Sequence, residues 1–404
     1  MLACSFLNPE HNLSFAIGFV LFFCAFLFSL ALVWMVRKYA PRLGLMDMPG
    51  ERKVHTKVIP RGGGIAIFFG VLVSYILGYF LIQFCSEAFP AWAKFAQIPD
   101  HAWKDIFSIV AGGMVIFATG LMDDLYDLRP RTKLAVEILV ALGLVFCDIR
   151  ATIFVESYAF SLIVSCFWII LITNSFNLLD NMDGLSSGVA MIVGILFLVV
   201  AVQTGQWMIA FLLVGLLGAI LGFFCYNFPP ASIFMGDCGS LFLGYMMSVL
   251  TIHATFYQST SIYPVALPIV LLSVPLFDTF TVVVLRIQVG SSIFKGDKRH
   301  FSHRLVKLGM TPYQAVFTIY LVTLATGLGA LLLYQTDLFG SIVILIQTLG
   351  ILSIIYILES PVRKAETSLS SKKKEDSGLA EDLCQKKSED KAEKPETPSD
   401  ILQK

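Results

Sequence analysis

Charged residues are scarce in this chain of 404 residues, of which only 14% are Asp, Glu, Lys or Arg and 56% are hydrophobic. A soluble domain usually carries about a quarter charged residues. Neither sign is in excess, because 29 Lys and Arg are balanced by 29 Asp and Glu. This composition excludes a soluble globular enzyme and a disordered protein, and the lack of a basic domain excludes a nucleic-acid-binding protein. It predicts a protein that crosses a membrane several times.

Cysteine pairs of the kind that bind metals are also missing. None of the eight cysteines belongs to a C-x-x-C pair, and most lie within apolar runs. The pattern excludes a secreted disulfide scaffold, and we interpret these cysteines as small buried or lipid-facing side chains.

Long apolar runs, by contrast, are frequent. A helix needs about 20 apolar residues to cross a bilayer, and the runs predict an all-α polytopic membrane protein with about eleven transmembrane helices. They lie near residues 13–36, 63–85, 105–122, 133–147, 158–178, 187–203, 207–226, 240–257, 264–286, 314–334 and 339–358. The C-terminal segment is rich in Lys, Glu, Ser and Pro and cannot bury apolar area. We therefore expect a transmembrane catalytic domain over residues 1–360 and a disordered charged tail over residues 361–404 that the chemistry does not need.

The placement of Lys and Arg indicates the orientation of these spans, because cytoplasmic loops carry an excess of both residues. Three loops on one side are basic, and the loops on the other side are nearly bare. The basic loops hold Arg37, Lys38, Arg42, Arg52, Lys53, Lys57 and Arg61, then Arg129, Arg131 and Lys133, then Lys295, Lys298, Arg299, Arg304 and Lys307. We expect the N-terminus outside and the C-terminus in the cytoplasm.

Four polar clusters fall on the same cytoplasmic side. Residues 123–127 end the third span, residues 174–184 end the fifth, residues 227–237 follow the seventh and residues 297–304 precede the tenth. The orientation rests on Lys and Arg alone, so this common placement of the acidic clusters is an independent observation. It predicts one site at the membrane surface, where a soluble substrate can meet a lipid.

The residue types in these clusters favour phosphate chemistry with a metal ion. Mg²⁺ prefers oxygen ligands and commonly combines one or two carboxylates with substrate phosphates, while Arg, Lys and His hold phosphate oxygens. Asp180 and Asp183 would share a helix face if the fifth helix continued that far. Asp278, inside the ninth span, is a further candidate, because carboxylates within a membrane are costly and often functional.

Each cluster alone also has an ordinary interpretation. A pair of aspartates can simply be solvated, Gly-Asp is a turn signal, and the late histidines can be interfacial residues. Asp278 can serve a hydrogen bond between helices. The order of the clusters along the chain and their common side favour a functional site.

Together and in this order, the clusters resemble the polyprenyl-phosphate N-acetylhexosamine-1-phosphate transferase family, which belongs to glycosyltransferase family 4. Residues 47–55, residues 59–64 and the sequence Phe-Met-Gly-Asp-x-Gly-Ser at residues 234–240 support the resemblance. It covers the chain from about Asp47 to about Gly309, and the tail has no counterpart in the shared pattern.

The resemblance implies that polyprenyl phosphate and a UDP-N-acetylhexosamine react to give a polyprenyl-diphospho-sugar and UMP. It implies Mg²⁺ as the cofactor, with Mn²⁺ as an alternative, and it favours GlcNAc as the sugar and undecaprenyl phosphate as the lipid. Such an enzyme performs the first membrane step of cell-envelope polysaccharide synthesis at the cytoplasmic face of the bacterial inner membrane. The expected partners are the two substrates, the lipid bilayer and a second copy of the chain in a homodimer, without nucleic acid.

The resemblance also implies roles for individual residues. Asp237 matches the principal Mg²⁺ ligand, and Asp123 and Asp124 match an acidic pair beside the metal. Asp123 is the first candidate for the base that deprotonates the lipid phosphate, and a covalent phospho-enzyme through an Asp is the alternative. The catalytic residues implied are Asp123, Asp124, Asp180, His300 and His303. The substrate-binding residues implied are Lys53, His55, Arg61, Asn177, Asp183, Asn227, Phe234, Gly236, Arg299 and Arg304.

The sequence departs from the family pattern at two positions. Asn181 stands where the family usually has Gly, and Asn tolerates a positive φ better than most residues do. The late motif His-x-His-His, at residues 300–303, has Ser302 in place of its middle histidine. We expect the flanking Arg299 and Arg304 to compensate for the lost histidine.

Three other functions fit parts of the pattern. Within the family, a phospho-N-acetylmuramoyl-pentapeptide transferase of peptidoglycan synthesis is the alternative, although its late motif is a denser run of histidines. A secondary transporter would place ionisable groups near the membrane midplane and often shows inverted repeats, whereas here the acids cluster at one interface. A catalytically inactive scaffold is the third alternative, because of Ser302.

Overall fold

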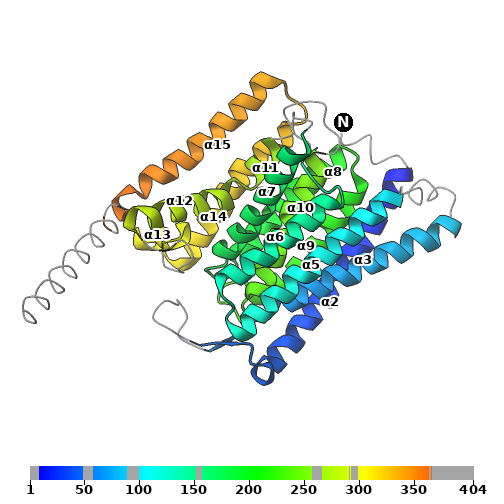
Figure 1. Ribbon diagram of the computed structural model, residues 1–404, viewed down its shortest axis with the longest axis horizontal. Helices are drawn as coiled ribbons and strands as arrows, with labels where there is room; N and C mark the ends of the chain where they lie inside the picture. The colour runs from blue at the N-terminus through cyan, green and yellow to red at the C-terminus, as the bar shows by residue number, and fades with distance from the viewer. Residues whose placement is uncertain are drawn as a thin grey trace, which may run out of the picture.

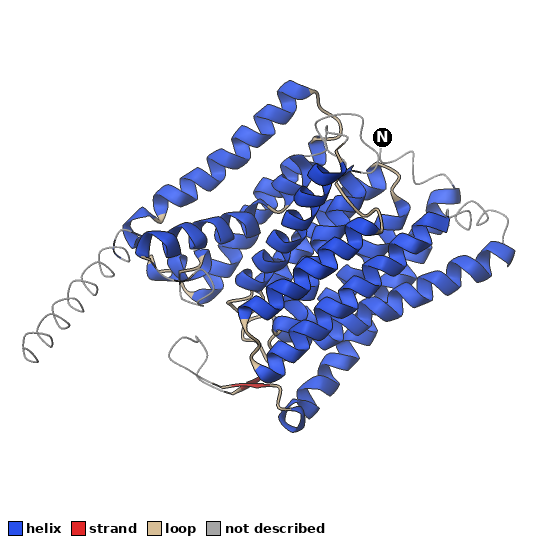
Figure 2. Ribbon diagram, viewed as in Figure 1, coloured by secondary structure: helices blue, strands red, loops and turns tan. Residues whose placement is uncertain are grey.

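The computed structural model describes residues 9–48, 58–88, 100–151, 157–256, 266–290, 292, 299–363 and 365. These residues form a bundle of helices, and the one strand pairing among them joins β1 (Met46–Asp47) to β2 (Ile59–Pro60) in antiparallel fashion (Figures 1 and 2). The helices are α2 (Pro9–Leu43), α3 (Gly63–Ala88), α5 (Asp100–Tyr126), α6 (Pro130–Phe146), α7 (Tyr158–Leu179), α8 (Leu185–Gln203), α9 (Trp207–Asn227), α10 (Asp237–Phe256), α11 (Ala266–Leu271), α12 (Ser273–Val289), α13 (Phe301–Lys307), α14 (Pro312–Gly327), the 3-10 helix η3 (Leu328–Leu332) and α15 (Leu338–Leu358).

Every predicted span coincides with helical structure. Within the described ranges, 8 helices are long and apolar enough to cross a membrane, so the prediction of an all-α polytopic membrane protein is confirmed at that level. The ninth predicted span is broken at Leu272 into α11 and α12. Helices α6 and α12 have 17 residues each, at the short end of the range for a transmembrane helix.

The boundary expected at residue 360 falls inside helical structure. Residues 360–363 continue as helix after α15, and the guanidinium of Arg363 lies over the ring of Tyr356 at 3.5 Å. The rest of the predicted tail, apart from Ala365, lies outside the described residues.

Helix α10 lies in the middle of the bundle and positions the centre of the site. Every residue from Cys238 to Ile252 is buried, and α10 packs against α5 and α7, while α2 packs against α9 and α3 (Figure 1). Because α10 begins at Asp237, its first carboxylate is held where the C-terminal ends of α5 and α7 meet it.

Glycine allows the helices to approach one another at this point. A Cβ atom on Gly120 of α5 would lie 2.4 Å from the carbonyl oxygen of Asp237, and a Cβ atom on Gly64 of α3 would lie 2.1 Å from the backbone nitrogen of Gly239. Both distances are far shorter than any van der Waals contact between these atoms, so neither position accepts a side chain without a shift of the backbone. The first turn of α10 is thus held tightly between α3 and α5.

Candidate functional site

Asp123, Lys133 and Asp237 form the centre of the candidate site. The ammonium group of Lys133, in α6, donates to Oδ2 of Asp123 at 2.8 Å and to Oδ2 of Asp237 at 2.9 Å. The backbone nitrogen of Leu128 donates to the second oxygen of Asp123 at 2.8 Å, which fixes this carboxylate at the end of α5. Lys133 therefore joins Asp123 to Asp237, which lies 104 positions after the lysine in the chain.

Asp124 holds the N-terminal end of α10. Its two carboxylate oxygens accept from the backbone nitrogens of Asp237 and Cys238 at 3.0 Å each. These are among the first N–H groups of a helix, which have no partner within the helix, and they favour a negative charge. The guanidinium of Arg61 donates to the carbonyl oxygen of Asp124, which places Arg61 beside the cluster, and its role in substrate binding stays a prediction.

Gly236 has a positive φ of 75° and lies directly against Asp124. A Cβ atom there would lie 2.6 Å from a carboxylate oxygen of Asp124. A left-handed backbone and this close approach both favour glycine. The turn before Asp237 is thus shaped around the Asp124 carboxylate.

Asp180 follows the last residue of α7 and lies close to the other carboxylates of the cluster. Burial is the main cause that raises the pKa of its carboxyl to about 8, and the nearby carboxylates of Asp237, Asp124 and Asp183 add to this rise. No donor within the described residues bonds the Asp180 side chain. Helix α7 ends at Leu179, so the condition under which Asp180 and Asp183 would share a helix face is not met.

Asp183, Asn177 and Asn227 connect the loops around the carboxylates. Oδ2 of Asp183 accepts from the backbone nitrogen of Ala231 at 2.9 Å, and the amide of Asn177 donates to Ser240 at 2.9 Å. The amide oxygen of Asn227 accepts from the backbone nitrogen of Gly184 at 3.1 Å, and its nitrogen donates to the carbonyl of Ile233 at 3.0 Å. The side chain of Asn227 is only 3% exposed, so its bonds fix two loops rather than face an open pocket.

Phe234 lies in the loop that leads to α10 and is half-buried. Its backbone nitrogen donates to the carbonyl of Pro60, and its carbonyl accepts from the nitrogen of Gly63, both at 2.9 Å. The loop is therefore attached to the start of α3, which keeps Phe234 beside the carboxylates.

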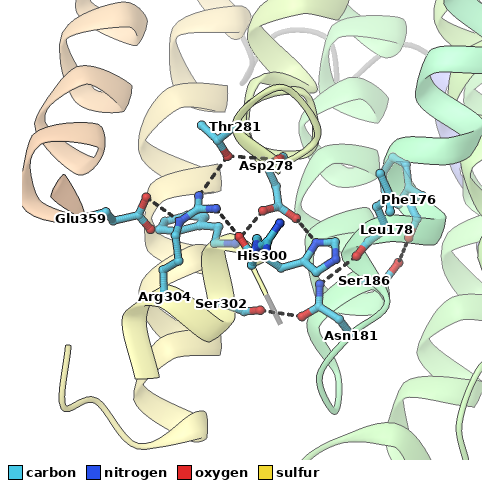
Figure 3. Close-up of polar contacts among 12 residues, drawn as sticks. Phe176, Leu178, Asn181, Ser186, Asp278, Thr281, His300, Ser302, Arg304 and Glu359 are labelled. Carbon is cyan, nitrogen blue, oxygen red and sulfur yellow. Dashed lines mark hydrogen bonds and ion pairs between the residues drawn. The ribbon is translucent and has the colours of Figure 1, made fainter. Parts of the chain in front are cut away.

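The late histidine motif forms the start of α13, and Asp278 of α12 holds it (Figure 3). Oδ2 of Asp278 lies 3.0 Å from Nδ1 of His300, and its other oxygen accepts from the backbone nitrogen of Phe301 at 2.6 Å. The rings of His300 and His303 have centroids 6.3 Å apart. A carboxylate that accepts from Nδ1–H fixes the tautomer and the orientation of the imidazole ring. Asp278 thus orients His300, whose catalytic role stays a prediction.

Arg304 differs from the prediction, which placed it on substrate phosphates. Its guanidinium is 0% exposed and donates to Glu359 and to the hydroxyl of Thr281 at 2.9 Å each, and also to the carbonyl of Arg299 (Figure 3). These bonds use all three guanidinium nitrogens within the protein. Arg304 therefore attaches α13 to α12 and to the end of α15.

The substitution Glu359→Ala is expected to lower the melting temperature of the detergent-purified protein. It would leave the buried Arg304 without a countercharge, and breaking a buried ion pair in this way costs about 3–5 kcal/mol. The control is truncation after Ala365, which removes the tail and keeps Arg363, whose guanidinium lies 3.5 Å from the Glu359 carboxylate. An unchanged melting temperature for Glu359→Ala would contradict this role.

Other predicted residues are placed as follows. Arg299 and His303 are half-buried, whereas Lys53 and His55 lie outside the described residues. Lys133 was counted in the sequence only as a topology signal, yet it lies at the centre of the cluster. Lys133 lies four residues before Glu137 on α6, and the Glu137 side chain is buried in the bundle. Residues four apart share a helix face, so this spacing could have indicated that Lys133 also points toward the cluster.

A divalent cation fits the chemistry of this cluster. Among the described residues no group of three His, Cys, Asp or Glu side chains has the arrangement of a formed metal site. The carboxylates of Asp123, Asp124, Asp180 and Asp237 nevertheless converge, and Lys133 contacts two of them. The carboxylates of Asp123, Asp124 and Asp237 outnumber the one ammonium group beside them, and carboxylate oxygens are the ligands that Mg²⁺ prefers.

Comparison with known proteins identifies the family of this chain. The family described as Glycosyl transferase family 4 matches residues 106–255. A probable undecaprenyl-phosphate N-acetylglucosaminyl 1-phosphate transferase of Bacillus subtilis (strain 168) is 32% identical over 336 residues, which are 81% of this chain and 87% of the relative.

Two other relatives extend the comparison. A decaprenyl-phosphate N-acetylglucosaminephosphotransferase of Mycobacterium tuberculosis (strain CDC 1551 / Oshkosh) is 29% identical, with 73% of this chain and 77% of the relative covered. An undecaprenyl-phosphate alpha-N-acetylglucosaminyl 1-phosphate transferase of Yersinia pestis is 27% identical, with 76% and 81% covered. The residues of the cluster and these similarities agree, and the chain belongs to glycosyl transferase family 4, among the polyprenyl-phosphate N-acetylhexosamine-1-phosphate transferases.

Proposed function

We propose that this chain transfers GlcNAc-1-phosphate from UDP-GlcNAc to undecaprenyl phosphate and releases UMP. The names of the relatives support the sugar and the lipid. The observation that carries the proposal is the convergence of Asp123, Asp124, Asp180 and Asp237 around Lys133. Asp123, Asp124 and Asp180 lie at the C-terminal ends of α5 and α7, which are long and apolar enough to cross a membrane, and a lipid phosphate could reach them there.

Asp237, with Asp123 and Asp124 beside it, would hold Mg²⁺. When bound, Mg²⁺ supplies charge neutralisation for the diphosphate and for the leaving UMP. Lys133 keeps the carboxylates of Asp123 and Asp237 at a fixed separation, and Asp124 fixes the end of α10 that carries Asp237. Hydrogen bonds within the protein thus fix the positions of these carboxylates. Phosphoryl transfer depends mainly on positioning and electrostatics, so a fixed cluster of this kind suits the reaction.

In the proposed reaction, an oxygen of the lipid phosphate attacks the β-phosphorus of the sugar nucleotide. The bond between that phosphorus and the bridging oxygen breaks, and UMP leaves with the oxygen. Asp123 accepts the proton of a lipid phosphate that arrives protonated. Both oxygens of Asp123 accept hydrogen bonds within the protein, and a covalent phospho-enzyme through an Asp stays the alternative. Arg61, whose guanidinium donates to the carbonyl oxygen of Asp124, lies where it could also approach a substrate phosphate.

The arrangement in the membrane is part of this proposal. About eleven spans, an external N-terminus and a cytoplasmic C-terminus would place the site at the cytoplasmic face of a bacterial inner membrane. The catalytic domain then covers residues 1–360 with a short helical extension, and the tail serves no step of the reaction. A homodimer remains a prediction, which light scattering of the detergent-purified protein checks.

A double-label experiment tests the function. Purified protein is incubated with undecaprenyl phosphate and with UDP-GlcNAc labelled at either the α- or the β-phosphorus. Transfer of the sugar with its phosphate predicts that the β-label moves into the lipid phase and the α-label appears in UMP. Appearance of both labels in UDP would show transfer of the sugar alone and would contradict the proposal. UDP-N-acetylmuramoyl-pentapeptide is the competing donor, and a preference for it would favour the peptidoglycan enzyme.

A further inference from the structure

The two positions at which this sequence departs from the family pattern contact each other. The hydroxyl of Ser302, in α13, donates to Oδ1 of Asn181 at 2.5 Å across a separation of 121 residues (Figure 3). Nδ2 of Asn181 donates to the carbonyl of Leu178, in the last turn of α7, at 2.8 Å. One side chain therefore joins the end of α7 to α13.

The Ser302 hydroxyl is buried, so the loss of its hydrogen bond to Asn181 would be costly. Ser302 is 1% exposed, and a buried hydroxyl without a partner loses its hydration without replacement. Glycine at position 181 would leave the Ser302 hydroxyl without this acceptor. A histidine at position 302 would need space that the Asn181 side chain now borders. The two departures from the family pattern are therefore physically linked.

The bond connects the two halves of the proposed site. Asn181 follows Asp180, whose carboxyl is close enough to Asp237 and Asp124 to be affected by their charge. Ser302 lies two residues after His300, whose ring is held by Asp278 at 3.0 Å. In Figure 3 the His300 ring lies between Asp278 and Asn181. A shift of α13 relative to the Asn181 loop would thus move the histidines relative to the carboxylates.

We propose that Asn181 and Ser302 are paired positioning residues, whose hydrogen bond sets the position of His300 and His303 relative to the carboxylates of the proposed Mg²⁺ site. The pair takes the place of the glycine and the histidine in the usual family pattern. The role in turnover rests on the proposed function, whereas the bond itself does not. Positioning errors of about 1 Å can change rates by about 100-fold, so a single bond can matter here.

A double-mutant cycle tests the pair with wild type, Asn181→Ala, Ser302→Ala and the double variant. Each single variant is expected to lower kcat by about threefold to tenfold, as expected for one hydrogen bond, while KM for UDP-GlcNAc changes less than kcat. The double variant should be no slower than the slower single variant, because the bond can be lost only once. The control is Ser341→Ala, which removes another buried hydroxyl that bonds a backbone carbonyl at 3.0 Å, at the start of α15.

A second cycle replaces the pair by the residues of the family pattern. Ser302→His alone is expected to be the most impaired variant, and Asn181→Gly combined with Ser302→His should recover most of the lost kcat. Additive effects in both cycles, or single variants that lower only the melting temperature and leave kcat unchanged, would overturn the proposal.

The melting temperatures of the same proteins separate this inference from the proposed function. A wild-type protein that does not turn over UDP-GlcNAc would refute the function. The melting temperatures of the four proteins in each cycle would then still test whether the hydrogen bond exists. Non-additive effects of the two substitutions on the melting temperature would support the bond, and additive effects would contradict it.

Discussion

The substitution Asp237→Asn is expected to reduce UMP release by at least about 100-fold, the size of effect seen when one fixed electrostatic group is removed from an active site. Asp237 is the first residue of the buried helix α10 and shares Lys133 with Asp123. Asn keeps the shape of the side chain and removes its charge, so the loss should appear in turnover and not in folding. The measurement is the initial rate of UMP release together with the melting temperature.

The matched control for Asp237→Asn is Asp105→Asn. Asp105 is a partly buried carboxylate on α5 that pairs with His253 at 3.1 Å, far along the helix from the cluster. Its replacement should leave turnover close to that of the wild type. Near-normal turnover in a correctly folded Asp237→Asn protein would remove Asp237 from the mechanism.

The substitution Lys133→Met is expected to have the second largest effect, with a loss of about 100-fold in turnover. Methionine keeps much of the length of the side chain but cannot bridge Asp123 and Asp237, whose carboxylates would then repel each other. The same variant should bind the sugar nucleotide less well, because positive charge is lost beside its phosphates.

Lys104→Met is the control for Lys133→Met, because Lys104 is an exposed lysine near the other end of α5. Initial rates of UMP release for the two variants, measured over a range of UDP-GlcNAc concentrations, give the comparison. Equal rates for Lys133→Met and the wild type would show that the bridge between the carboxylates is dispensable.

Much of this arrangement could be predicted from the sequence, and the reason is physical. A bilayer demands long apolar helices, so the spans follow from hydropathy and length. Lys and Arg are more frequent in cytoplasmic loops, and their distribution in the sequence predicts that the acidic clusters lie on one side of the membrane. The convergence of Asp123, Asp180 and Asp237 agrees with that expectation.

Other features depend on partners that are distant in the chain, and sequence patterns do not reveal them. Lys133 looked like a topology signal, because its two partners lie on other helices. Arg304 looked like a phosphate ligand, but its countercharge, Glu359, lies 55 residues later at the end of α15. The contact between Asn181 and Ser302 could not be predicted for the same reason, because the two residues lie 121 positions apart in the chain.

The most direct test of the central claim is the dependence of phosphate transfer on Mg²⁺. The measurement follows the β-phosphorus label of UDP-GlcNAc into undecaprenyl phosphate, with wild-type protein and with Asp237→Asn, as Mg²⁺ is titrated from zero in the presence of EDTA. We predict that label enters the lipid only when Mg²⁺ is added and only when Asp237 is intact. Transfer by the wild-type protein in EDTA, or equal transfer by the two proteins, would contradict the account.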